Sequence, residues 1–212
     1  MPNWCSNQFT VTGSHEALAD FVGRAFGLPA VYPPREHDTE ANTPCTTKYL
    51  CFNATVPTPQ EIIDIGFDGR GVVDITKFYA GDYTEPLDGY HWNLHNWGTK
   101  WDIYADNIDP ESMGWDEDCE ELGMYFLTAW SPPIAWVEQL ATLFPELNFH
   151  LEYEESGSYF AGEATVEKGC ITYRQYTDEE CDALFHRDDD DEDDEDDEDD
   201  DDASPEEPLE KT

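Results

Sequence analysis

A run of fifteen consecutive acidic residues, 188–202, restricts the fold of this chain more than any other feature. Such a run repels itself and offers no side chain to bury, so we expect residues 188–212 to form a disordered acidic tail. The hydrophobic core must then come from residues 1–187. We expect one domain with loop insertions over that range, because its length and aromatic content suit a single ordinary core.

The first part of the domain pairs a strand pattern with a helix pattern. Residues 8–12 alternate in polarity and are β-branched, which predicts a strand. Ser14 and apolar residues at helical spacing predict a helix that ends near Gly27. Residues 49–56 have the composition of a second strand, and residues 61–65 predict a short helix that begins after a proline.

The second part repeats this order. Residues 122–130 form the longest apolar run, and we expect a central strand that is buried on both faces. Ser131 and two prolines indicate the start of a helix over residues 134–144. The remaining patterns predict strands at 101–105, 147–154, 159–166 and 171–176, a helix or an extended segment at 72–78, and a short helix at 178–185.

Two strand–helix–strand units in succession are typical of an α+β domain. We therefore predict a ferredoxin-like antiparallel sheet with two main helices packed on one face. The acidic tail follows this domain and takes no part in it.

The negative charge is not confined to the tail. Residues 188–212 hold 18 acidic residues and one lysine, and residues 1–187 hold 32 acidic and nine basic residues, so the two parts carry −17 and −23 of the net −40. This excess argues against direct binding to nucleic-acid phosphates or to anionic membranes. It favours a basic protein, a polyamine or weakly bound metal cations as partners. The alternative is a purely solubilising role.

Nothing in the sequence predicts export or a disulfide framework. The chain starts without a basic segment and an apolar run, and no stretch reaches the length of about 20 apolar residues that spans a bilayer. The six cysteines are scattered, without a Cys-x-x-Cys pair. We expect a cytoplasmic protein with reduced thiols and no membrane partner.

Residues 92–102 hold three of the seven tryptophans, a glycine and a lysine. The segment 96–102 has three interpretations: indoles packed on the sheet, a groove for a protein partner, or a catalytic pocket with Lys100 as nucleophile or acid and Asp102 as base. The candidate binding residues are Trp4, Asn96, Trp97, Gly98, Thr99, Lys100, Trp101, Asp102 and Trp130.

Other clusters predict no chemistry. His91 and His95 are four residues apart and could join Asp88 and Asp102 around a metal, but their surroundings are poor helix sequence, so we expect loop histidines that make hydrogen bonds. The acidic residues at 116–121 lack the pattern of a calcium loop. We predict no catalytic residue, no metal ligand and no cofactor.

Several motifs together resemble the Api92-like (YubB-type) family of phage and plasmid proteins. They occur in order over about residues 1–165: MPNWCSN at 1–7, NWGTKWD at 96–102, TAWSPP at 128–133, FP at 144–145, YEE at 153–155 and YFAG at 159–162. The resemblance implies a ferredoxin-like domain and a mobile-element origin. It implies no catalytic residues, and the acidic tail is not part of the family pattern.

These observations lead to three expectations about function. The first is a non-enzymatic accessory protein that binds a basic host or element protein and mimics nucleic-acid charge with its acidic surface. The second is a small enzyme with its pocket at residues 96–102. The third is a structural module that its acidic tail keeps soluble.

Overall fold

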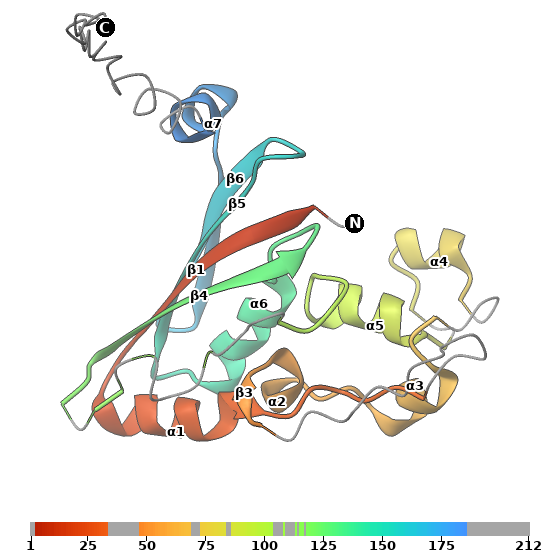
Figure 1. The fold of residues 1–212 in the computed structure, drawn as a ribbon, viewed down its shortest axis with the longest axis horizontal. Coiled ribbons are helices and arrows are strands. Elements are labelled where there is room, and N and C mark those ends of the chain that lie inside the picture. Colours follow the sequence, from red (N-terminus) through yellow and green to blue (C-terminus); the bar gives the residue numbers. More distant parts are fainter. Residues whose placement is uncertain are drawn as a thin grey trace, which may run out of the picture.

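The computed structural model describes residues 3–33, 47–68, 73–83, 86–103, 108, 113, 115–116 and 118–185 (Figure 1). The predicted tail at 188–212 lies outside these residues. The elements are β1 (Trp4–Thr12), α1 (His15–Ala25), β2 (Phe26–Gly27), β3 (Tyr49–Leu50), α2 (Phe52–Thr55), α3 (Gln60–Ile65), α4 (Ile75–Tyr79), α5 (Gly89–Asn96), β4 (Glu121–Ala129), α6 (Ile134–Leu143), β5 (Asn148–Glu155), β6 (Phe160–Glu167), β7 (Cys170–Gln175) and α7 (Asp178–Phe185).

The main sheet has five strands in the order β4-β1-β5-β6-β7, and each neighbouring pair is antiparallel. The chain leaves β4 through α6 and returns as β5, with β1 between these two parallel strands. This arrangement is the split strand–helix–strand unit of ferredoxin-like domains. The prediction of an α+β chain with an antiparallel sheet is confirmed.

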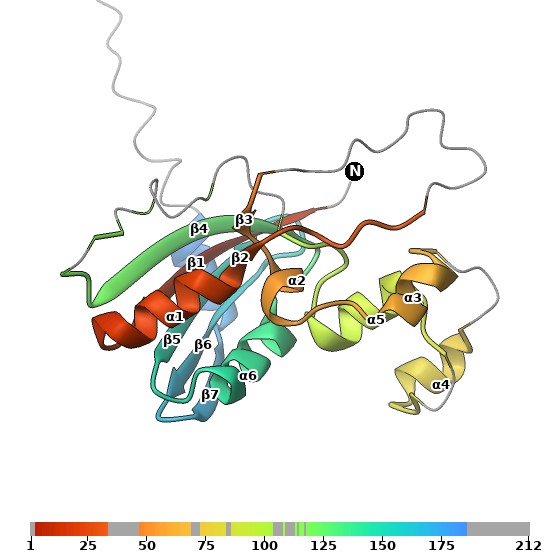
Figure 2. The ribbon, with the colours of Figure 1, turned by 90° about the horizontal axis from the view of Figure 1, so that it is seen from below.

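Helices α1 and α6 cover the same face of this sheet (Figure 2). Alternate residues of each strand point toward them, and on β1 these include Phe9 and Val11, both almost fully buried. The Phe9 ring stacks on Phe149 with centroids 5.8 Å apart and lies 5.2 Å from the Trp136 ring of α6. The core therefore lies between the sheet and the two helices, as the two-layer prediction requires.

The local signals for α1 and α6 act as predicted. Ser14 Oγ accepts a hydrogen bond from the Ala17 amide at 3.3 Å, which satisfies one free donor at the start of α1. Proline precedes α6, where no amide donor is needed. Both helices bury an apolar stripe, consisting of Leu18, Phe21 and Ala25 in α1 and of Trp136, Val137, Leu140 and Ala141 in α6.

The predicted strand at 49–56 is wrong. Only Tyr49–Leu50 of this segment forms a strand, and it pairs with Phe26–Gly27 in a separate two-stranded sheet. The chain then turns into α2, and the Phe52 ring enters the core at 0% exposure. The turn forms because Asp102, fifty residues away, accepts hydrogen bonds from the first two amides of α2, a contact that strand propensity does not include.

The strand at 122–130 exists as β4, but it is an edge strand and not a central one. Its residues alternate between buried and exposed, and Tyr125 is 57% exposed. The expectation of burial on both faces failed because helices cover only one face of the sheet.

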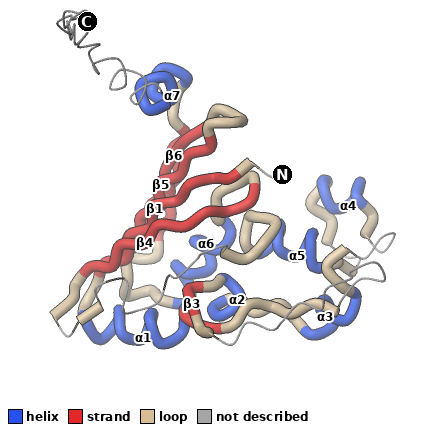
Figure 3. The backbone as a smooth tube through the Cα atoms, viewed as in Figure 1, coloured by secondary structure: helices blue, strands red, loops and turns tan. Residues whose placement is uncertain are grey.

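One further prediction, the strand at 101–105, is not confirmed, and the open alternative at 72–78 is decided by the structure. Residues 101–102 form a bend and residue 103 has no regular structure, so no strand starts here, and residues 104–105 lie outside the described part of the chain. The ambiguous segment at 72–78 is helical from Ile75, because Asp74 accepts hydrogen bonds from the Thr76 and Lys77 amides. Short helices α2 to α5 form an insertion that lies beside the sheet (Figure 3). None of the described helices has the length and apolar character needed to cross a bilayer.

Candidate functional site

The first half of the segment 96–102 holds the insertion against the start of α6. Gly98 has φ +85°, and an added Cβ would meet the backbone nitrogens of Ile134 and Ala135 at 3.1 and 3.2 Å. Glycine is required here by both its conformation and the close approach. Ser131 Oγ donates a hydrogen bond to the Gly98 carbonyl at 2.7 Å, and this bond joins the segment to the end of β4.

The neighbouring side chains also serve the fold. The Trp97 indole is 1% exposed and donates from Nε1 to the Val56 carbonyl at 3.0 Å. Thr99 is fully buried and donates from Oγ1 to the Ala129 carbonyl at 3.0 Å. Asn96 donates from Nδ2 to the Trp92 carbonyl at 2.9 Å. These predicted site residues therefore form the packing layer beneath the surface.

Asp102 has its carboxylate oxygens occupied by backbone amides. Its Oδ1 accepts from Phe52 at 2.6 Å and from Ile103 at 2.8 Å, and its Oδ2 accepts from Asn53 at 3.2 Å. Burial raises the pKa of Asp102 to about 6, and the three amide bonds oppose that rise. The carboxylate thus caps α2, and its hydrogen-bonding capacity is used in the fold.

Lys100 and Trp101 are half-buried. The Lys100 ammonium is 4.5 Å from the Trp101 ring centroid and 4.4 Å from that of Trp130, with the Tyr90 ring at 5.8 Å. These are cation–π distances, so the lysine holds two indoles that are far apart in sequence.

A third indole joins them. Trp4 lies 6.1 Å from Trp101 between ring centroids and is 37% exposed, while Trp130 is 45% exposed. Trp130 has φ +71°, a left-handed conformation that a bulky residue rarely adopts, and its amide donates to the Asn3 carbonyl at 3.0 Å. We call Trp4, Lys100, Trp101 and Trp130 the indole patch. The structure brings these four predicted residues together where β1 begins and β4 ends.

The face of the sheet opposite α1 and α6, here called the open face, is acidic. One row of paired residues crosses all five strands: Tyr125, Gln8, Glu152, Glu163 and Arg174. By the same alternation Trp4 of the indole patch lies on this face of β1. A hollow of about 300 Å³ lies between this face and α7, and Gln8, Tyr125 and Tyr176 are among its lining residues. The strand carboxylates on the open face are those of Glu121, Glu152, Glu154, Glu163 and Glu167.

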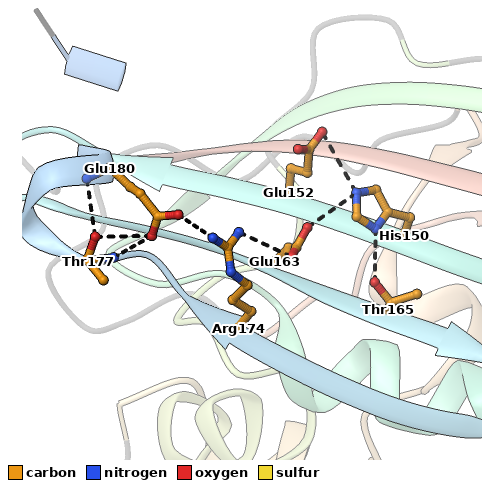
Figure 4. A network of polar contacts seen from close by, with 7 residues as sticks. All are labelled: His150, Glu152, Glu163, Thr165, Arg174, Thr177 and Glu180. Carbon is orange, nitrogen blue, oxygen red and sulfur yellow. Dashed lines mark hydrogen bonds and ion pairs between the residues drawn. The ribbon is translucent and has the colours of Figure 1, made fainter. Parts of the chain in front are cut away.

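The open face also holds a cluster that the sequence patterns did not single out. His150, Glu152 and Glu163 have donor atoms that all lie within 4.8 Å of one another (Figure 4). A signal existed in the sequence, because His150 and Glu152 are two apart on a predicted strand and Glu163 lies on its hairpin partner.

His91 and His95 lie on α5, so the expectation that they occupy a loop was wrong. Asp88 caps this helix by accepting from the His91 amide at 2.9 Å, and its Oδ1 is also 2.7 Å from His91 Nδ1. The His95 ring lies 3.9 Å from that of Tyr83. The two histidines and Asp88 are thus engaged in local contacts of the insertion.

A comparison with known proteins identifies the class of domain that this chain contains. A family model described as the ferredoxin-like domain in Api92-like protein matches residues 100–202, so the chain is an α+β protein with a ferredoxin-like domain. This match confirms the resemblance to the Api92-like family. The matched range includes three of the four residues of the indole patch: Lys100, Trp101 and Trp130.

A crystal structure of a protein Api92 from Yersinia pseudotuberculosis is similar to this chain at 11% sequence identity, with a TM-score of 0.40. The similarity covers 84% of this chain and 99% of that one. No curated protein matches the chain.

Proposed function

We propose that this chain is a non-enzymatic accessory protein of a phage or plasmid. It acts in the host cytoplasm and binds a basic protein through the indole patch and the acidic open face. The observation that carries the proposal is the gathering of Trp4, Trp101 and Trp130 at the surface around Lys100.

Partly exposed indoles held in fixed positions are typical of binding hot spots. Tryptophan is enriched at the centres of protein interfaces, because a large ring loses much water on contact at a small cost in side-chain entropy. Here the cation–π contacts of Lys100 and the hydrogen bond from the Trp130 amide to Asn3 hold the rings before any partner arrives. A preorganised patch of this kind supports high affinity.

The charge of the protein supports a basic partner. Trp4 begins the same face of β1 that continues through Gln8 beside Glu152, so the indole patch adjoins carboxylates. A partner with a nucleic-acid-binding face meets negative charge there, as it does on a phosphate backbone. The −23 of residues 1–187 and the −17 of residues 188–212 add long-range attraction that salt screens.

The enzymatic alternative receives less support from the geometry. A catalytic base must reach a substrate proton, but both oxygens of Asp102 accept from backbone amides at the start of α2 and at Ile103. The role of Lys100 in the patch is explained by its two indole neighbours.

The proposal is tested by capturing partners from a bacterial lysate on the immobilised full chain. At low salt we expect a basic nucleic-acid-binding protein to be retained, and we expect high salt to release it. The double variant Trp4→Ala/Trp130→Ala should lose most of this binding, because it removes two of the three indoles. Deletion of residues 188–212 should weaken capture without abolishing it.

The matched control is Tyr79→Ala, which removes an aromatic ring that is 73% exposed on α4, outside the indole patch. Capture by this variant should equal that of the native chain. If the double tryptophan variant captures as much basic protein as the native chain, the indole patch is not the binding surface. Recovery of no basic protein at low salt would contradict the proposed function.

A further inference from the structure

We propose that His150, Glu152 and Glu163 form a binding site for Zn²⁺ on the open face of the sheet. The site is separate from the indole patch and does not depend on the proposed function. It is built on β5 and β6, whose antiparallel register places Glu152 opposite Glu163 and His150 opposite Thr165. Paired residues share a face, so the three side chains converge in one place.

The three donor atoms surround a space of the size that a cation requires. His150 Nε2 is 3.9 Å from Glu152 Oε2 and 4.0 Å from Glu163 Oε2. Zinc binds histidine nitrogen and carboxylate oxygen at about 2.0–2.2 Å, so an ion between these atoms needs only small side-chain rotations to reach all three. Figure 4 shows the histidine ring directed toward both carboxylates.

Neighbouring side chains hold the ligands in a binding orientation. His150 Nδ1 is 3.1 Å from Thr165 Oγ1. In the tautomer that carries its proton on Nδ1, this proton is donated to the hydroxyl and the Nε2 lone pair faces the two carboxylates. Arg174 Nη1 lies 3.5 Å from Glu163 Oε1, the oxygen that the cation does not use. Contacts of this kind fix the tautomer and ring position of metal-binding histidines.

Two carboxylates lie opposite each other in this cluster. Like charges directly opposite each other on neighbouring strands destabilise a sheet, and Glu152 and Glu163 occupy such positions. Arg174 offsets part of this repulsion at Glu163, and a protonated His150 lies within ion-pair distance of both carboxylates. A divalent cation between the carboxylates removes the repulsion and binds the neutral imidazole as well.

The donor set selects the class of metal. One imidazole nitrogen and two carboxylate oxygens suit a borderline ion such as Zn²⁺, whereas Mg²⁺ and Ca²⁺ prefer oxygen donors alone. The side chains of His150, Glu152 and Glu163 are 38%, 48% and 28% exposed, so a fourth position faces solvent. Water or a group from a binding partner completes a tetrahedron there.

The test uses the full chain and ZnCl₂, with the histidine imidazole nitrogens followed by NMR and the affinity measured by calorimetry. The acidic residues at 188–202 offer carboxylates but no imidazole, so a shifted histidine signal separates this site from the tail. We expect one equivalent of zinc to shift the Nε2 signal of one histidine. That signal should be missing in His150→Gln.

The variants define the site further. We expect the affinity of the histidine-linked site to fall about tenfold or more in His150→Gln and Glu163→Gln, and about tenfold in Thr165→Val, which removes the hydroxyl acceptor. His95→Gln, a change in an exposed histidine of α5, should leave the affinity unchanged. Circular dichroism confirms that each variant folds. If zinc leaves the His150 imidazole unmoved, or if His150→Gln binds zinc as tightly as the native chain, the cluster is a surface ion-pair network and the proposal is overturned.

Discussion

The two faces of the main sheet differ in what decides their residues. Along β1, Phe9 is 1% exposed beneath the helices, while the next residue toward the start of the strand, Gln8, lies on the open face. The residues of the covered face serve packing: the Phe9 ring contacts the rings of Trp136 and Phe149. The open face places the carboxylate of Glu152 opposite that of Glu163, a pairing that packing does not explain. A surface with such a pairing is a candidate for binding.

The largest difference should come from adjacent residues of β1. Phe9→Ala should lower the free energy of unfolding by about 3–5 kcal/mol, because it leaves a cavity among aromatic rings. Gln8→Ala, one position away, should change it by at most about 0.5 kcal/mol. Urea denaturation of both variants measures the contrast. Similar losses in the two variants would show that the open face is packed as tightly as the covered one.

Asp102, a carboxylate within the helical layer, should produce a pH-dependent stability. Its folded-state pKa is about 6, above the ordinary value of 3.8, so the folded protein holds this proton to a higher pH than the unfolded chain does. The contribution of Asp102 to stability is therefore lost as the pH rises from about 4 to about 6, by about 3 kcal/mol, and stays constant above that. Asp102→Asn should remove this part of the pH dependence in urea denaturation at a series of pH values.

Glu155 provides the internal check on that measurement. Hydrogen bonds from the Ser158 side chain, the amides of Gly157 and Ser158, and Asn3 lower the pKa of Glu155, although burial opposes them. Its contribution is thus lost as the pH falls below the ordinary value of 4.5, the opposite direction to Asp102. A slope between pH 4 and 6 that persists in Asp102→Asn would contradict the assignment.

Two glycines make the next contrast. Gly98→Ala should cost about 1–3 kcal/mol, because φ is +85° and the new Cβ would press on the backbone at the start of α6. Gly123 on the open face of β4 has no atom within 4 Å of an added Cβ. Gly123→Ala should therefore be neutral or stabilise by about 0.5–1 kcal/mol. Thermal unfolding of both variants measures this contrast. If Gly98→Ala is as stable as the native chain, the backbone of Gly98 does not approach α6 as closely as described.

The smallest effect concerns the opposed carboxylates. In metal-free buffer, Glu152→Gln should raise stability by about 0.2–1 kcal/mol, since it removes a like-charge pair across two strands. The gain should shrink as salt is added, because the pair is exposed and screened. Unfolding curves at low and high ionic strength measure both effects. A loss of stability in this variant would mean that Glu152 supports the fold.

Local patterns predicted most of the sheet and both main helices. Short-range signals such as Ser14 and the prolines before α6 act within a few residues, so they are readable in sequence. The helix α2 was missed because Asp102 supplies its cap from fifty residues away. The edge position of β4 was missed because an apolar run does not reveal which faces have neighbours.

The sequence also predicted some features of the two candidate sites and missed others. Sequence motifs brought attention to Trp4, to residues 96–102 and to Trp130, but they did not separate the buried Trp97 from the exposed Trp130. The histidine–glutamate cluster was overlooked, although the hairpin spacing between β5 and β6 contains it. Burial and convergence depend on contacts between distant segments, and a pattern along the chain does not specify them.

The sequence by itself determined the α+β class, the order of the main strands and helices, the resemblance to the Api92-like family and the large negative charge. Each of these depends on composition or on residues that are close in the chain. Only the tertiary structure decided which tryptophans reach the surface, why Asp102 caps a helix, and which carboxylates face one another. The physical reason is that burial, electrostatic repulsion and hydrogen-bond partners are properties of the assembled layers, in which residues far apart in the chain lie within a few ångströms of one another.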